Sequence, residues 1–99
     1  MIVVNVRVVS TPESRAATRA ALVDLEAPTR AEGGCEEYAW YVSATEPDVF
    51  MTVERWTSAE ALEAHMQSPH VKAVLAAAGE LLAEAPVVVE HEVSVSRTK

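Results

Sequence analysis

The residues best suited to acid–base chemistry lie between positions 50 and 70 of the chain. Glu54 and Trp56 alternate along a run of strand-forming residues, and His65 and His70 follow in a helical segment. A carboxylate and an imidazole are side chains that a purely apolar packing solution avoids. Imidazole changes its charge near neutral pH and can accept a proton from a substrate. The sequence therefore predicts a site in this region, with His65 as its general base.

The sequence does not decide which groups form hydrogen bonds or ion pairs with His65 and Glu54. Glu54 could orient His65 and stabilise its protonated form. It could equally neutralise Arg7 or Arg55 in an ion pair that serves only the structure. His65 in turn could be a half-buried residue bonded to Glu54 or to a backbone carbonyl, with no part in any reaction.

Six elements must position these side chains. One helix is predicted from Thr11, its N-cap, to the glycines at positions 33 and 34. A second, interrupted helix over residues 57–82 begins at Thr57 and restarts at Ser68. Runs rich in β-branched residues predict strands over residues 2–10, 35–43, 50–56 and 86–96. The order βαββαβ predicts an α+β, ferredoxin-like fold, in which an antiparallel sheet carries two helices on one face.

The first predicted strand has apolar residues on both faces. One face is aliphatic throughout and consists of Ile2, Val4, Val6 and Val8. The other face carries Asn5 and Arg7. Because the helices cover only one face, we expect the aliphatic face to meet a second copy of the chain, and Asn5 and Arg7 to face the helices. Glu54, Trp56 and His65 would then share a cavity with Asn5.

Three short motifs resemble a known family: Glu54-Arg55-Trp56 at the end of a strand, Ala61-Leu62-Glu63-Ala64-His65 in a helix, and then Ser68-Pro69-His70. Together they are similar to the antibiotic biosynthesis monooxygenase (ABM) family of small dimeric α+β barrel proteins. The run Ala31-Glu32-Gly33-Gly34-Cys35, the following Tyr38 and the opening strand extend the resemblance over nearly the whole chain. The resemblance implies a homodimer in which two sheets pack face to face as a barrel.

The resemblance also bears on individual site residues. Trp56 matches the Trp assigned to substrate contact in actinorhodin-type monooxygenases of the family, and its indole offers an N–H donor for an oxyanion. The Asn and Tyr that accompany that Trp are Thr52 and Leu62 here, so the catalytic set of those enzymes is not reproduced. Asn5 matches an Asn of haem-degrading relatives. Leu75 stands where their haem-ligating His would be, which implies that haem is not bound in the same way.

Composition narrows the class of protein. The 99 residues suit one domain over residues 1–99, and the net charge of −7 argues against a nucleic-acid partner. No apolar run has the length of a membrane span, and no signal peptide is evident. The single cysteine, Cys35, suits a reducing compartment, so we expect a cytoplasmic protein.

Neither a cofactor nor a metal ion is expected from the sequence. No glycine-rich phosphate loop supports a nucleotide or flavin. His65 and His70 straddle Pro69 at a spacing unlike that of helical metal-binding pairs, and His91 lies on a distant strand. The sequence therefore predicts no metal site.

Together with these observations, the resemblance implies a cofactor-independent monooxygenase that oxidises a small electron-rich aromatic or quinol with O₂. His65 would take a phenolic proton, while Asn5 and the Trp56 N–H would hold the oxyanion. Glu54 completes the predicted catalytic group. The residues predicted to bind substrate are Arg7, Thr52, Leu62 and His70.

Two alternatives stay open. The same His could isomerise a small hydroxyketone or a phosphorylated signal, in which case Arg7 or Arg55 would have to meet the phosphate. Alternatively, the protein is a non-catalytic homodimer that binds a small apolar ligand.

Overall fold

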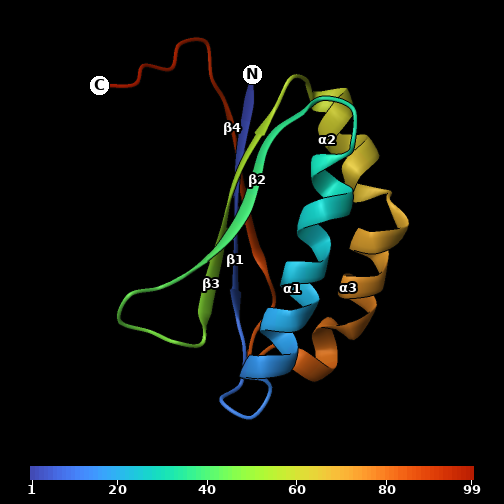
Figure 1. Cartoon of the computed structure of the whole chain (residues 1–99), viewed down its shortest axis with the longest axis vertical. Helices are drawn as coiled ribbons and strands as arrows, with labels where there is room; N and C mark the ends of the chain where they lie inside the picture. The colour runs from blue at the N-terminus through green and yellow to red at the C-terminus, as the bar shows by residue number, and fades with distance from the viewer.

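The computed structural model describes residues 1–99 and has four strands and three helices. Their bounds are β1 Ile2–Val9, α1 Arg15–Arg30, β2 Cys35–Val42, β3 Val49–Trp56, α2 Ala59–Met66, α3 Pro69–Leu81 and β4 Val87–Glu92. The strands form one antiparallel sheet in the order β2-β3-β1-β4, and all helices lie on one side of it (Figure 1). This confirms the predicted ferredoxin-like α+β fold. The predicted interrupted helix is two separate helices, α2 and α3.

Two of the three predicted helix starts are displaced. Ser68 caps α3 as predicted, because its side chain accepts the backbone N–H of Val71 and Pro69 opens the helix. Helix α1 begins after Ser14 instead of Thr11, because the hydroxyls of these two residues bond each other in a turn. Helix α2 is capped by Ser58, whose Oγ accepts the N–H of Ala61 at 3.2 Å.

The prediction of which face of β1 meets the helices is wrong. Ile2, Val4 and Val8 are buried in the core between the sheet and the helices. The register pairs Ile2 with Trp56 and Val4 with Glu54, and paired residues share a face of an antiparallel sheet. Asn5 and Arg7 therefore lie on the face away from the helices. Alternation alone could not decide this, because each face of the strand carries aliphatic residues and either could supply the core.

The face away from the helices, here called the outer face, remains uncovered in the single chain (Figure 1). Its exposed apolar side chains come from β2, β3 and β4 and are Tyr41, Met51, Val53, Val87 and Val89. The outer face is thus the surface available for a second sheet. None of the three helices has both the length and the apolar character needed to cross a bilayer.

The break between α2 and α3 shapes the surroundings of His65. Gln67 and Ser68 separate the two helices. The Ser68 hydroxyl donates a hydrogen bond to the carbonyl of His65 at 2.6 Å. His65 consequently lies in the last turn of α2, and His70 in the first turn of α3. The two histidines come together at a corner of the backbone, not along one continuous helix.

Candidate functional site

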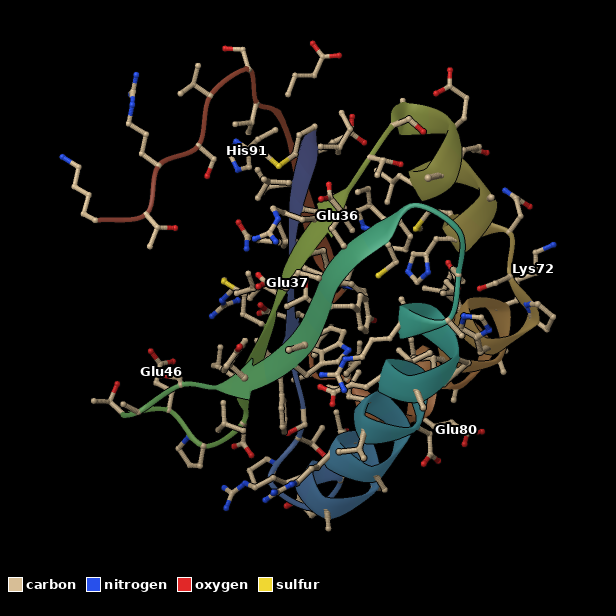
Figure 2. All side chains as sticks on the ribbon, turned by 45° about the horizontal axis from the view of Figure 1, so that its top comes forward. Glu36, Glu37, Glu46, Lys72, Glu80 and His91 are labelled. Atoms are coloured by element: carbon tan, nitrogen blue, oxygen red, sulfur yellow. The ribbon has the colours of Figure 1, made fainter.

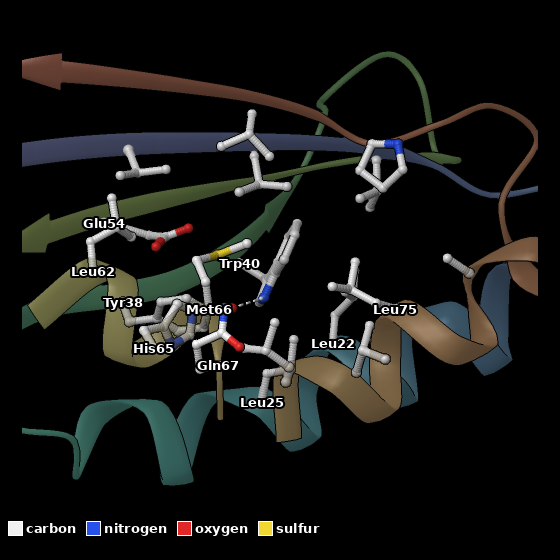
Figure 3. Close-up of a pocket in the computed structure, with 18 of the residues that line it drawn as sticks. Leu22, Leu25, Tyr38, Trp40, Glu54, Leu62, His65, Met66, Gln67 and Leu75 are labelled. Carbon is white, nitrogen blue, oxygen red and sulfur yellow. Dashed lines mark hydrogen bonds between the residues drawn. The ribbon is translucent and has the colours of Figure 1, made fainter. Parts of the chain in front are cut away.

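A cavity of about 940 Å³ lies between the sheet and the helices. Of its 27 lining residues, 19 are hydrophobic, which suits an apolar ligand of small-molecule size. Figure 3 shows the side chains that converge on it from the sheet on one side and the helices on the other. The largest apolar walls come from Leu22, Leu25, Trp40, Leu62, Met66 and Leu75.

Glu54 is a buried carboxylate on the sheet side of this cavity. Each of its carboxylate oxygens accepts a hydrogen bond. Thr52 Oγ1 donates to one oxygen at 2.8 Å, and Trp56 Nε1 donates to the other at 3.0 Å. Burial raises the pKa of Glu54, and the two hydrogen bonds oppose that rise. Glu54 pairs with neither arginine considered above, since Arg7 bonds Glu84 and Arg55 lies near Glu37.

His65 faces the same cavity from α2 and is only 4% exposed. Its ring centroid lies 4.7 Å from that of Trp56 and 5.5 Å from that of Tyr38. Its Nδ1 lies 3.0 Å from the carboxylate of Glu32, which must accept the hydrogen bond. The partner of His65 is therefore Glu32, not Glu54 or a backbone carbonyl. With the ring proton on Nδ1, Nε2 is the nitrogen that can accept a proton.

Glu32 was not predicted as a site residue, although it lies in the run Ala31–Cys35 that carries part of the family resemblance. It comes from the loop between α1 and β2, and its second carboxylate oxygen contacts Nε2 of His70. Gly34 allows this loop to approach α2, because a Cβ at that position would lie 2.5 Å from Cβ of Ala61. One carboxylate thus links both histidines.

Tyr38 and Trp40 form a second polar feature that the sequence reasoning left unassigned. The Trp40 indole donates to the Tyr38 hydroxyl at 3.0 Å, as the dashed line in Figure 3 marks. Burial strongly raises the pKa of Tyr38, so its hydroxyl keeps its proton. Because the Tyr38 oxygen accepts from Trp40, its own proton is free to be donated to a ligand. Alternation along β2 carried the signal for both residues, since it puts Tyr38 and Trp40 with Val42 on one face of the strand.

The remaining predicted residues divide into four groups. Leu62 lines the cavity, as expected of a substrate-binding residue. Asn5 and Arg7 lie on the outer face, where Asn5 Nδ2 donates to the carbonyl of Thr52 at 2.9 Å. Thr52 and Trp56 are completely buried behind Glu54, and the Trp56 N–H is committed to that carboxylate. His70 contacts Glu32 at the edge of the site and does not line the cavity.

The charged residues around the cavity are all acidic. Glu54, Glu60, Glu63 and Glu90 line it, and no lysine or arginine does. A negative potential of this kind repels anions, while an apolar wall favours uncharged ligands. The arrangement therefore suits a neutral ring with a group that can give up a proton to His65.

The chain matches the sequence model described as "Antibiotic biosynthesis monooxygenase" over residues 1–77. A Mycobacterium tuberculosis protein named "Putative monooxygenase Rv0793" is 41% identical over 81 residues, which cover 82% of this chain and 79% of that protein. The solved structure of Rv0793 aligns with a TM-score of 0.91 over 98% of both chains, at 35% identity. The structure of a "putative antibiotic biosynthesis monooxygenase" from Deinococcus radiodurans aligns with a TM-score of 0.94 over 100% of this chain and 98% of its own, at 23% identity, and so shares the fold.

Proposed function

Because the chain belongs to the antibiotic biosynthesis monooxygenase family, we propose that it is a cofactor-independent monooxygenase of a small, uncharged, electron-rich aromatic such as a quinol. The observation that carries the proposal is the position of His65, held by Glu32 and facing an apolar cavity of about 940 Å³. A base in such a place can ionise a bound phenol while the walls exclude water. O₂ is itself apolar and can share the same space.

In the proposed reaction, Nε2 of His65 takes the phenolic proton. Glu32 then stabilises the imidazolium through the Nδ1–H bond, as the carboxylate does in other His–carboxylate pairs. The substrate anion gives an electron to O₂, and the two radicals recombine at a ring carbon. One oxygen atom stays there as a carbonyl and the other leaves as water, so the substrate supplies all the electrons.

The developing oxyanion needs a hydrogen-bond donor, and the geometry favours Tyr38 for this role. Its hydroxyl proton is uncommitted, whereas the two predicted donors are engaged elsewhere: Asn5 on the outer face and the Trp56 N–H on Glu54. An oriented donor of this kind typically contributes about 10²–10³-fold in rate. Trp40 orients Tyr38 and offers a flat wall for an aromatic ring.

The isomerase alternative with a phosphorylated substrate receives little support from these contacts. Both arginines that would meet a phosphate, Arg7 and Arg55, pair with glutamates away from the cavity. The cavity instead has four glutamates among its lining residues. A phosphate there would face repulsion without a compensating cation.

We also propose that the protein acts as a homodimer in the cytoplasm. A second copy would cover the exposed apolar side chains of the outer face. These include Val87 and Val89 of the edge strand β4. The free thiol of Cys35 is compatible with a reducing compartment.

Oxygen uptake with a panel of neutral quinols and polyphenols tests the proposed function. We expect consumption of O₂ with matching quinone formation, and incorporation of label from ¹⁸O₂ into the product. Phosphorylated hydroxyketones should be neither consumed nor isomerised. Tight binding of neutral aromatics without any oxygen uptake across the panel would instead identify a ligand-binding protein.

A further inference from the structure

Three metal-ligating side chains from separate segments meet beside the cavity. They are Glu32 from the α1–β2 loop, His65 from α2 and His70 from α3. Each offers one ligand atom, and these atoms all lie within 4.8 Å of one another. Nδ1 of His65 is 3.0 Å from one Glu32 oxygen, and Nε2 of His70 contacts the other.

We propose that Glu32, His65 and His70 form a binding site for a divalent transition-metal ion, with Zn²⁺ as the best-matched occupant. Two imidazoles and one carboxylate are the ligand set of many zinc sites with an open fourth position. Bonds of about 2.0–2.1 Å in a tetrahedron place neighbouring ligand atoms roughly 3.3 Å apart. Nδ1 of His65 and the Glu32 oxygen are 3.0 Å apart, and all three ligand atoms lie within 4.8 Å of one another, so side-chain rotations alone can bring them to this spacing.

The chemistry of the ligands selects among cations. Ca²⁺ and Mg²⁺ prefer oxygen ligands, and this cluster offers a single carboxylate. Imidazole nitrogens favour Zn²⁺ and its neighbours in the transition series. One carboxylate also leaves a net positive charge on the loaded site, which the acidic surroundings of a chain with net charge −7 tolerate well.

The backbone holds the three ligands in place before any ion binds. Ser68 bonds the carbonyl of His65 and caps the helix that carries His70, which fixes the corner between the two histidines. Gly34 has a φ of 83° and packs its loop against Ala61, which fixes the loop that carries Glu32. His65 is buried, but the side chains of Glu32 and His70 are 19% and 23% exposed, so an ion and a fourth, solvent ligand can enter from their side.

The site goes beyond the proposed function and has a consequence for it. An imidazole that binds a metal through Nδ1 carries its proton on Nε2. His65 could then no longer take a proton from a substrate, and Glu32 would be drawn to the ion. Metal occupancy and base catalysis are therefore competing states of the same residue.

Titration of the metal-free protein tests the site without any substrate. Isothermal titration calorimetry with Zn²⁺ should give one equivalent per chain with a dissociation constant in the micromolar range or below. Co²⁺ should give the strong visible absorption of a tetrahedral complex, which Zn²⁺ then displaces. The variants His70→Ala and Glu32→Gln should weaken Zn²⁺ binding at least about tenfold, in line with the loss of a ligand.

The matched control is His91→Ala, because His91 lies on β4 away from the helices (Figure 2) and should leave Zn²⁺ binding unchanged. Circular dichroism must show that each variant is folded. Replacement of the part-exposed His70 is the less disruptive of the two changes to the fold. Zn²⁺ binding that is equal in His70→Ala, Glu32→Gln and the unmutated protein would overturn the proposal. Absence of saturable binding in the unmutated protein would overturn it as well.

Discussion

His65 and Glu54 both contact Trp56, yet their environments differ in a way that separates their roles. His65 packs its ring on Trp56 and bonds the part-exposed Glu32, which gives it a route to solvent. Glu54 accepts two hydrogen bonds from its own strand and lies among apolar residues. The first arrangement suits a group that gains and loses protons, and the second suits a group that stays fixed.

His65→Ala should reduce the turnover of a quinol substrate by about 10²–10⁴-fold, the usual contribution of a positioned general base. Added imidazole should restore part of the rate, because it can enter the space left by the side chain and act as the base. Initial rates of oxygen uptake measure both effects. His91→Ala is the control and should retain full activity. A His65→Ala protein with an unchanged rate would assign His65 to the structure.

Glu54 makes stability depend on pH in a predictable direction. Its pKa is raised above 4.5 in the folded protein, so the folded state holds this proton more tightly than the unfolded chain does. Its contribution to the free energy of unfolding is therefore complete below pH 4.5 and is lost as the pH rises through the raised pKa.

The variant Glu54→Gln removes this proton and should flatten that part of the pH profile. Urea unfolding at a series of pH values from acid to neutral, on both proteins, gives the difference. We expect the unmutated protein to lose stability relative to Glu54→Gln as the pH increases. A difference that is constant with pH, or one that changes in the opposite direction, would contradict a raised pKa.

The loop between α1 and β2 and the corner between α2 and α3 are the elements that assemble the site. Gly34 joins the α1–β2 loop to the start of α2: its carbonyl accepts the N–H of Thr57 at 2.9 Å, and its missing side chain leaves room for Ala61. Its φ of 83° lies in the left-handed region that other residues enter only with strain.

Gly34→Ala should therefore destabilise the protein by about 2–4 kcal/mol, since backbone strain and a steric overlap add. It should also weaken the contacts of Glu32 with His65 and His70. The neighbouring Gly33→Ala is a matched control, because a Cβ there meets nothing within 4 Å. That variant should be neutral or stabilised by up to about 1 kcal/mol. Chemical denaturation of both variants measures the contrast, and equal stabilities would refute this account of the loop.

The whole molecule presents two different surfaces, a helical side and an uncovered sheet. Exposed valines occur on both: Val53 on the outer face is 38% exposed and Val23 on α1 is 54% exposed. Val53 shares the outer face with Ala39, Tyr41 and Met51, whereas Val23 lies on a helix. This difference predicts where a second copy of the chain binds.

Val53→Asp should split the proposed homodimer, because a carboxylate would be buried between the sheets at a cost of about 3–5 kcal/mol. This corresponds to at least about a 100-fold weaker dimer. Val23→Asp, the same change on the helical side, should leave the dimer intact. Sedimentation equilibrium at micromolar concentration distinguishes the two results. A stable monomer of the unmutated protein would rule out the dimer through this face.

The sequence by itself determined the order of the elements and the corner at Ser68-Pro69. These depend on residues close together in the chain, where capping, strand propensity and motif spacing act directly. Tertiary structure alone decided which face of β1 is covered, because alternation defines two faces without saying which one meets the helices. It also decided that His65 bonds Glu32 across 33 positions of the chain, and that Asn5 lies outside the cavity. Long-range pairs of this kind arise only when loops close and elements pack, so the cluster of Glu32, His65 and His70 had no local signature that could reveal it.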